Sequence, residues 1–515
     1  MNTEKTIRIG GFVLDTLTTG MYTNSLDVVR EYVQNSFDAI REAENKGILK
    51  KRSGRIEITV DEKGKRLIIE DNGTGIPAQL FAQRLLNIGL SEKDLESDTG
   101  FRGIGRLAGI AYCEKLIFDS KSHEEHEESH LEIDCEELKH SMSPFSKNSD
   151  DLLEIMSRNT KITTSINKTD KHFFRVTMNN VSMETPELLS RTAIEGYLSE
   201  VAPVEFDYQR FVFAKKIEEW LINNQMELPT VAVVVRASDG ERQVFKPYRT
   251  HYKTRNFKLD IMDIEFFESR EDEKLSFWGW YGKSDLLGMI EDSRSAGIRM
   301  RKNNMSIGGA QRINEIFSQI APSNERFNSY YIGEIHIISS DAVPNARRDG
   351  MEELGAWPRI KQSMKVFFDK LCKDVRDASG ARNRPMQKIR AQTAKVIEEA
   401  SIAQRQGFCS ESEVDAVRGK LKKEIEIVEK AKKGRNNEGD HKELEKISQE
   451  LSERLDSLEK PNYIAKRLKP ELDKKQRKLV SEILNILMTT LDPNNYRLAK
   501  NAILGKFGLN GEDDA

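Results

Sequence analysis

The sequence has few cysteines and no long apolar run. Its four cysteines, Cys113, Cys135, Cys372 and Cys409, are scattered and form no C-x-x-C pair. This pattern argues against a zinc site or a disulfide framework and fits a reducing compartment. No run of about 18 apolar residues occurs, and the first residues lack the apolar core of a signal peptide. We therefore expect a cytoplasmic protein without membrane contact.

The net charge and the apolar content are also low. A formal net charge of −3 gives no global attraction to nucleic acid or to a membrane surface. Hydrophobic residues make up 37% of the chain and charged residues 32%, which indicates long solvated helices rather than one large core. A chain of 515 residues is expected to form about three domains.

Residues 30–40, R-E-Y-V-Q-N-S-F-D-A-I, predict an amphipathic helix. Its apolar residues recur at steps of three and four: Leu26, Val29, Val33, Phe37 and Ile40. The same spacing places Glu31 and Asn35 one turn apart on one face, with Asp38 following on that side. Taken alone, this polar stripe is typical of a solvated helix face. The next two segments favour a functional face instead.

The second segment is D-N-G-T-G-I, which begins at Asp71. Two predicted strands, residues 55–60 and 66–71, lead into it through a hairpin turn at Gly64. A carboxylate at a strand end can accept a hydrogen bond from an exocyclic amine, and Gly73 and Gly75 let the backbone lie against a planar base. The alternative is an ordinary glycine-rich turn.

The third segment is G-F-R-G-I-G, residues 100–105, before a predicted apolar helix at 107–112. Backbone N–H groups at such a helix entrance form an anion site, and Lys93, Arg102 and Arg106 add positive charge. The segment is neither a Walker loop, because it lacks G-K-[ST], nor a dinucleotide fingerprint.

The three segments in this order resemble the motifs of the GHKL (Bergerat-fold) ATPases. This family includes gyrase B, the ninety-kilodalton heat-shock chaperones, histidine kinases, and MutL with its MORC relatives. E-x-x-x-N-S-x-D-A resembles the first box, D-N-G-T-G-I the second and G-F-R-G-I-G the third. Ser91 and Lys93, which precede the third box, are most similar to the MORC and MutL pattern.

The resemblance implies ATP and Mg²⁺ as ligands and a role for each matching residue. Glu31 is the general base, Asn35 binds Mg²⁺, and Asp71 reads the adenine amine. Gly75 lies under the base, while Gly103 and Gly105 wrap the phosphates beneath a mobile lid at about 87–99. The residues expected to bind the nucleotide or its metal are Asn35, Asp38, Asp71, Gly73, Gly75, Ile76, Lys93, Gly100, Arg102, Gly103, Ile104 and Gly105.

One element departs from the family pattern. A Gly-Thr pair opens a late strand in the family, but the candidate strand at 172–181 has none, and the sequence does not set the register of Thr177. Before this strand lies H-E-E-H-E-E-S-H, residues 123–130. Its histidines and glutamates suggest a metal site, but its position between two predicted strands favours a solvated hairpin loop.

The middle of the chain predicts mixed strands and helices. Residues 231–237 and 276–282 are expected to form buried strands, and 297–308 a basic strand with a turn at Asn303-Asn304. Residues 344–349, P-N-A-R-R-D, resemble the middle domain of the ninety-kilodalton chaperones at Pro344, Asn345, Arg348 and Asp349. The resemblance implies that Arg348 reaches the γ-phosphate. Arg347, Arg301 and Lys302 are alternatives, as is a simple charge pair at a helix start.

The last third predicts helices throughout. Residues 359–390 hold ten Lys/Arg and three Asp, which fits a nucleic-acid surface or, more simply, a solvated helix face. Two heptad-like runs predict an antiparallel coiled-coil hairpin at about 411–460: Val414, Val417, Leu421, Ile425, Val428, and Leu444, Ile447, Leu451, Leu455, Leu458. The apolar segment at about 475–491 predicts a dimerisation helix.

We expect an α+β protein with a Bergerat-type ATP-binding domain at 1–191. A transducer-like middle domain at 192–358 and a helical region at 359–515 follow. The expected function is ATP hydrolysis by a homodimeric clamp that remodels client proteins, as a chaperone does. The alternative is a MORC- or MutL-like clamp that binds DNA, in repair or phage defence. The sequence leaves the client, protein or DNA, open.

Overall fold

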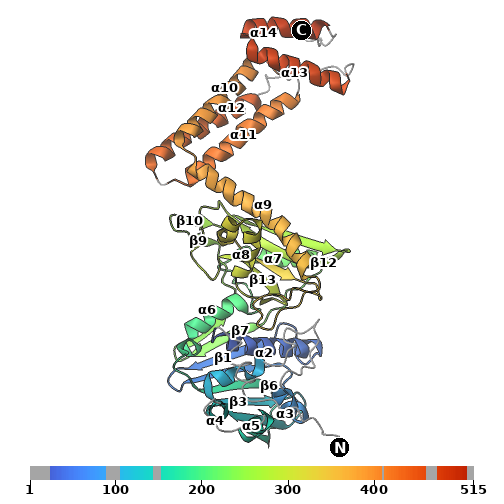
Figure 1. Cartoon of the computed structure of the whole chain (residues 1–515), viewed down its shortest axis with the longest axis vertical. Coiled ribbons are helices and arrows are strands. Elements are labelled where there is room, and N and C mark those ends of the chain that lie inside the picture. Colours follow the sequence, from blue (N-terminus) through green and yellow to red (C-terminus); the bar gives the residue numbers. More distant parts are fainter. Residues whose placement is uncertain are drawn as a thin grey trace, which may run out of the picture. The chain divides into compact units, whose positions relative to one another are not determined.

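The fold is α+β, with one large mixed sheet, two smaller sheets and a helical C-terminal region. The computed structural model describes residues 24–87, 105–142, 152–406, 408, 411–435, 437–459 and 473–506. The chain divides into two compact units (Figure 1). The first comprises Met1–Ser284 with Gly288–Cys372, and the second Asp285–Leu287 with Lys373–Ala515.

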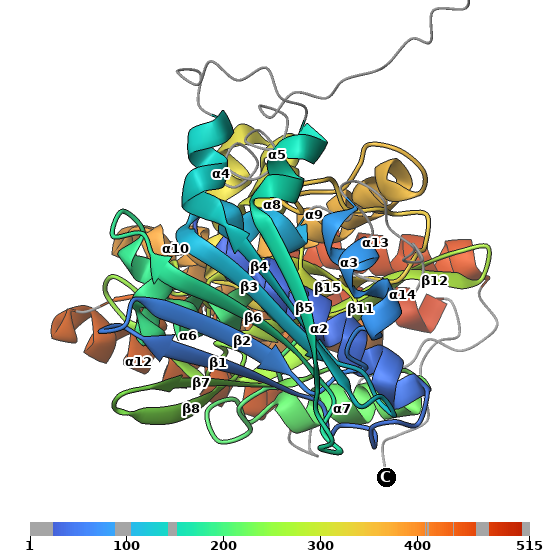
Figure 2. The ribbon, with the colours of Figure 1, turned by 90° about the horizontal axis from the view of Figure 1, so that it is seen from below.

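The first sheet has eight strands in the order β5-β4-β3-β6-β2-β1-β7-β8 (Figure 2). Neighbouring strands are antiparallel, except that β1 and β7 run parallel. The strands are β1 (Arg55–Asp61), β2 (Arg66–Asp71), β3 (Cys113–Lys121), β4 (Glu127–Asp134), β5 (Thr160–Ile166), β6 (Phe173–Val181), β7 (Ala232–Ala237) and β8 (Gly240–Val244). The predicted strands at 55–60, 66–71 and 172–181 are confirmed, and residues 123–130 form the β3–β4 turn and the start of β4.

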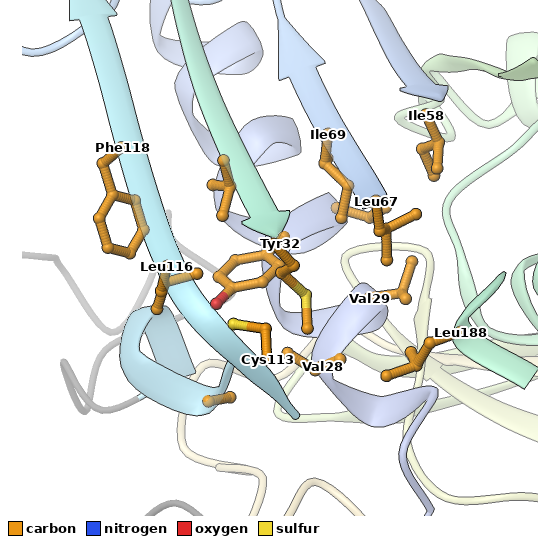
Figure 3. Close-up of a cluster of buried hydrophobic side chains, with 14 of the residues drawn as sticks. Val28, Val29, Tyr32, Ile58, Leu67, Ile69, Cys113, Leu116, Phe118 and Leu188 are labelled. Carbon is orange, nitrogen blue, oxygen red and sulfur yellow. The ribbon is translucent and has the colours of Figure 1, made fainter. Parts of the chain in front are cut away.

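One face of this sheet packs against the helix α2 (Asp27–Asn45), as the apolar spacing predicts. Figure 3 shows Val28, Val29 and Tyr32 of α2 directed toward Leu67 and Leu116 of the strands. The other helices of this part are α3 (Ala78–Leu86), η1 (Gly105–Ala111), α4 (Cys135–Met142), α5 (Leu152–Arg158), η2 (Pro186–Leu189) and α6 (Arg191–Val201). The predicted helix at 107–112 is a 3-10 helix, η1.

The first sheet continues beyond the predicted boundary at residue 191. Residues 232–236 of β7 pair in parallel with residues 55–59 of β1. The predicted buried strand at 231–237 is therefore confirmed, but it belongs to the same sheet as the opening strands. The boundary between the first two domains stays a prediction.

A second sheet of five strands has the order β11-β12-β15-β13-β14. The elements around it are α7 (Ala214–Asn223), β9 (His251–Lys253), β10 (Lys258–Asp260), β11 (Asp263–Glu271), β12 (Lys274–Lys283), β13 (Gly297–Lys302), β14 (Met305–Ser306), α8 (Gln311–Ile320), η3 (Pro322–Tyr330) and β15 (Ile332–Ile337). Asn303 and Asn304 have φ of 48° and 62°, so the predicted turn between β13 and β14 is confirmed.

A buried ionic cluster ties this second sheet to the end of α6. Arg301 and Lys246 both bind the carboxylate of Glu334, and these side chains are 0% exposed. Arg301 also donates to the backbone oxygens of Glu200, at 2.8 Å, and Ala202, at 3.3 Å. The cluster therefore links β13 and β15 to the C-terminal end of α6.

The C-terminal helices are α9 (Trp357–Asn383), α10 (Met386–Gln406), α11 (Glu411–Lys433), α12 (Glu438–Glu459), α13 (Lys474–Thr490) and α14 (Pro493–Lys506). The contacts Lys432–Glu445 and Arg418–Leu458 show that α11 and α12 are antiparallel, as predicted. The hairpin is not isolated, since Ile389 and Val396 of α10 share its core. None of the helices in the described residues is long and apolar enough to cross a membrane.

Candidate functional site

The helix α2 carries Glu31 and Asn35 on the side opposite its packed face. Val29, Val33 and Phe37 are 0% exposed, whereas Glu31 and Asn35 are half-buried. Asp38, three residues after Asn35, is buried. The predicted polar stripe is therefore present, but it lies in a crowded environment and not on a solvated helix face.

The carboxylate of Glu31 is enclosed by the start of η1 and by the preceding arginine. A Cβ atom built on Gly105 would lie 2.3 Å from Oε2 of Glu31, so a larger residue at this position would displace the carboxylate. Nη2 of Arg30 lies 3.2 Å from Oε1 of Glu31, and Nη1 lies 3.2 Å from Oδ1 of Asp27. The carboxylate therefore has a fixed cationic neighbour on one side and a glycine backbone on the other.

Tyr32 fixes η1 against α2. Its hydroxyl donates to the backbone oxygen of Arg106 at 3.2 Å and accepts from the backbone N–H of Gly109 at 3.0 Å. Since Tyr32 follows Glu31 in the helix, the backbone after the third glycine segment is held beside the Glu31 carboxylate.

Asp71, at the end of β2, presents an unpaired carboxylate oxygen. Its side chain is 2% exposed, Oδ1 accepts from the backbone N–H of Gly73 at 2.9 Å, and the hydroxyl of Ser36 on α2 lies near enough to lower the pKa of the carboxyl. Oδ2 has no hydrogen-bond partner in the part of the chain that the structure describes. Burial raises the pKa of Asp71 to about 7, although the hydrogen bonds from Ser36 and Gly73 oppose this shift. A buried acceptor without a donor is costly, so this atom is suited to a ligand donor.

The loop after Asp71 is packed between α2 and the end of β3. A Cβ atom on Gly73 would lie 2.8 Å from Ala39, and one on Gly75, whose φ is +65°, would lie 2.2 Å from the backbone oxygen of Lys121. The backbone N–H of Ile76 donates to Oγ of Ser120 at 2.8 Å. Both glycines are thus required by close protein contacts, and the loop is held firmly beside Asp71.

The register of β6 decides which of its residues borders Asp71. Thr177 pairs with Ile68 and Phe174 pairs with Asp71. Because side chains alternate between the two faces of a strand, Thr177 lies on the opposite face from Asp71. Phe174, not a threonine, occupies the position beside the carboxylate.

The loop that carries Arg348 lies next to the start of α2. A bridge between Pro344 and Met351 closes the loop, and Nδ2 of Asn345 donates to Oδ1 of Asp349 at 2.7 Å. Arg348 has a φ of 54°, a backbone conformation that residues other than glycine rarely adopt. The predicted helix start is wrong here, since α9 begins only at Trp357.

Arg30 joins this loop to Glu31. Its Nη2 lies 3.3 Å from the backbone oxygen of Arg347 and 3.2 Å from the Glu31 carboxylate. The structure therefore brings the Arg347-Arg348 loop to within one side chain of Glu31, although Arg30 and Arg347 lie 317 residues apart.

The two alternatives to Arg348 on β13 are engaged elsewhere. Arg301 is fully buried in the ionic cluster with Glu334. Lys302 donates from Nζ to the backbone oxygen of Ser339 at 2.5 Å, and burial lowers its pKa to about 8. Neither partner, Glu334 or Ser339, belongs to α2.

Five predicted binding residues lie outside the described residues: Lys93, Gly100, Arg102, Gly103 and Ile104. Three residues at the site are not predicted by the sequence motifs, namely Arg30, Ser36 and Phe174. For Arg30, the only indication in the sequence is its position directly before Glu31. The roles of Ser36 and Phe174 become visible only when the pairing of β2 with β6 is known.

Part of the chain matches a known family model. Residues 22–184 match the family model of the histidine kinase-, DNA gyrase B- and HSP90-like ATPases. The matched segment contains α2, the loop after Asp71 and β6. The match supports a GHKL-type ATPase domain, whose members typically bind ATP, usually with Mg²⁺, and hydrolyse it. A search of curated proteins finds no match to the chain.

Proposed function

We propose that this protein is an ATPase in which Asp71 reads the adenine amine and Glu31 directs hydrolysis. The observation that carries the proposal is that α2 serves both ends of the site. At one end, the backbone N–H of Thr74, in the loop after Asp71, donates to the backbone oxygen of Ala39 on α2 at 3.3 Å. At the other end, Glu31 lies against Gly105. Glu31 and Ser36, the α2 residue near Asp71, are five positions apart, or about 7.5 Å along a helix, which suits a nucleotide that lies along α2.

The donor set around α2 fits Mg²⁺-ATP. Mg²⁺ prefers oxygen ligands and usually keeps several waters when it binds a nucleotide, so one side-chain oxygen, that of Asn35, suffices. When bound, the ion neutralises phosphate charge. Asp38 follows Asn35 on the same side of α2 and supplies negative charge near the metal.

Glu31 accepts a proton from water as the water oxygen attacks the γ-phosphorus. A phosphorus–oxygen bond to water forms, the bond to the β-phosphate oxygen breaks, and ADP leaves with that electron pair. Arg30 holds the Glu31 carboxylate in place through its 3.2 Å contact. Since Arg30 also binds the Arg347 backbone, the position of the 344–351 loop is transmitted to the catalytic carboxylate.

Arg348 is proposed to bind the γ-phosphate, and this gives a matched test. Arg348→Ala is expected to lower kcat by about 100-fold, because one charge-assisted donor to the transition state is lost. Arg347→Ala is the control, because its side chain is exposed and only its backbone oxygen contacts Arg30. Steady-state phosphate release measures both variants. If Arg347→Ala lowered kcat more than Arg348→Ala, the γ-phosphate contact would belong to Arg347 and the proposal for Arg348 would be wrong.

The proposed quaternary state is a homodimer formed through α13. Val480 and Leu484 are buried, but Leu479, Ile483 and Ile486 are 58%, 40% and 61% exposed. Their spacing of four and three places them on one stripe of the helix. A second copy of the chain is the proposed partner of this stripe.

Replacing Ile483 with aspartate is expected to convert the dimer to a monomer, because an unpaired charge at an apolar interface is costly. Light scattering should then give a mass near 59.0 kDa instead of twice that value. Asn485→Asp adds the same charge on another exposed side of α13 and should leave the dimer intact. If wild type is monomeric with and without a non-hydrolysable ATP analogue, the dimer proposal fails.

The proposed work of the dimer is chaperone-like remodelling of a client protein, coupled to ATP turnover. The expected result is an ATPase rate that needs Mg²⁺ and does not respond to DNA at any salt concentration. DNA stimulation that falls steeply with salt would favour the DNA clamp, since phosphate contacts release counterions. Absence of nucleotide binding in calorimetry would reject the function as a whole.

A further inference from the structure

Phe174 stands beside the carboxylate of Asp71, whose Oδ2 has no hydrogen-bond partner among the described residues. It pairs with Asp71 on β2 and with Ser120 on β3, so the three side chains share one face of the sheet. Directly opposed residues in a sheet have Cβ atoms about 5 Å apart. The ring of Phe174 is therefore the nearest side chain from β6 to the Asp71 carboxylate.

The ring of Phe174 is fixed but only partly covered. It stacks on Phe118 with a centroid distance of 6.0 Å and an interplanar angle of 26°. Val176 and Met178 continue the same row of β6 and are fully buried, whereas Phe174 is half-buried. The row thus ends in a partly exposed aromatic side chain at the position that pairs with Asp71.

The polar neighbours of Phe174 on this face are already engaged. Oγ of Ser120 accepts from the backbone of Ile76 and donates to the backbone oxygen of Phe173 at 3.2 Å. His172, two residues before Phe174, hydrogen bonds through Nδ1 to the backbone oxygen of Gly73. These groups are occupied by the protein itself, so Phe174 presents an apolar surface at this edge of the site.

We propose that Phe174 contacts the edge of adenine beside its exocyclic amine and gives this edge an apolar wall in place of a hydrogen-bonding one. This inference rests on the proposed function, in which Asp71 accepts a hydrogen bond from that amine. The amine is flanked by ring nitrogens N1 and N7, and the nitrogen that faces Phe174 receives no hydrogen bond from this wall. Recognition on this side then combines one carboxylate with one apolar contact.

Deaza analogues of ATP test the inference, since each replaces one ring nitrogen by C–H. Calorimetry would compare ATP, 1-deaza-ATP and 7-deaza-ATP. For wild type, one analogue is expected to bind within about threefold of ATP, because no hydrogen bond is lost. In Phe174→Thr, which adds a hydroxyl, the same analogue should weaken relative to ATP by about fivefold. Phe174→Leu remains apolar and should keep the wild-type ratio.

Phe173→Leu is the matched control, because Phe173 lies on the opposite face of β6 and should leave all three affinities unchanged. The inference fails if wild type binds both analogues more than about tenfold weaker than ATP, or if Phe174→Thr leaves the ratios unchanged. If Phe174→Thr does not fold, the wild-type ratios alone still decide. Failure of wild type to bind ATP would instead reject the proposed function, and the inference with it.

Discussion

Glu31→Gln is expected to lower kcat for ATP hydrolysis by about 100- to 1,000-fold while ATP affinity stays within about threefold. Glutamine has nearly the same shape as glutamate but cannot accept the proton of the attacking water. The Glu31 carboxylate lies against Gly105 and beside Arg30, so a side chain of equal size is needed to keep this packing. Phosphate release gives kcat, and calorimetry gives the affinity.

Glu42→Gln is the control for this experiment. Glu42 lies on the same helix, its side chain is 45% exposed, and it pairs with Lys46 at the surface. The same chemical change there should leave both kcat and affinity unaltered. Glu31 is not the general base if Glu31→Gln keeps more than about a third of the wild-type rate, since a base contributes at least about 100-fold.

Local periodicity was sufficient to predict the elements that surround the site. The three- and four-residue steps from Leu26 to Ile40 fixed α2, and the alternation in residues 55–60 and 66–71 fixed β1 and β2. Each of these patterns depends on neighbours within one or two turns. The turn at Asn303-Asn304 was predictable for the same reason.

Pairing between distant segments was not predictable. The strand β7 carries the apolar run of a buried strand, but its sequence does not say that it pairs with β1 across more than 170 residues. The third helix that shares the core of the α11–α12 hairpin is a similar case. In both cases the partner is selected by packing of the whole domain, which leaves no local signal.

The candidate site divides in the same way. Glu31, Asn35 and Asp71 follow from spacing within single segments, and their proposed roles stay predictions. The contact of Arg30 with the Arg347 backbone and the pairing of Phe174 with Asp71 depend on long-range geometry. Thr177 shows the limit clearly, because a shift of register by one residue exchanges the two faces of a strand.

Asp71→Asn is expected to weaken ATP binding by about 100-fold. The carboxylate acceptor Oδ2 would be replaced by an amide group, and an amide N–H facing the adenine amine leaves two donors opposed; such a loss costs about 3 kcal/mol. GTP carries a carbonyl where ATP carries the amine, so the variant should gain in affinity for GTP relative to ATP. Competition binding with the two nucleotides measures this shift.

The pH dependence of binding gives the same residue a second test. Burial raises the pKa of Asp71 to about 7. The ionised carboxylate is the better acceptor for the adenine amine, because protonation removes its negative charge and turns one oxygen into a donor. ATP affinity in wild type should therefore fall as the pH drops below about 7, by up to tenfold per pH unit. The terminal phosphate also titrates near this range, so the slope is compared with that of Asp71→Asn, which should lack the protein contribution.

Glu70→Gln controls for the loss of a carboxylate on the same strand. Glu70 lies on the other face of β2, where its Oε2 accepts from Nε of Arg175 at 2.6 Å. The variant should keep both the affinity and the pH slope of wild type. Equal slopes in wild type and Asp71→Asn would show that Asp71 does not titrate on binding. If Glu70→Gln bound ATP more weakly than wild type, the loss would reflect a less stable β2, because a side chain on that face cannot reach the base.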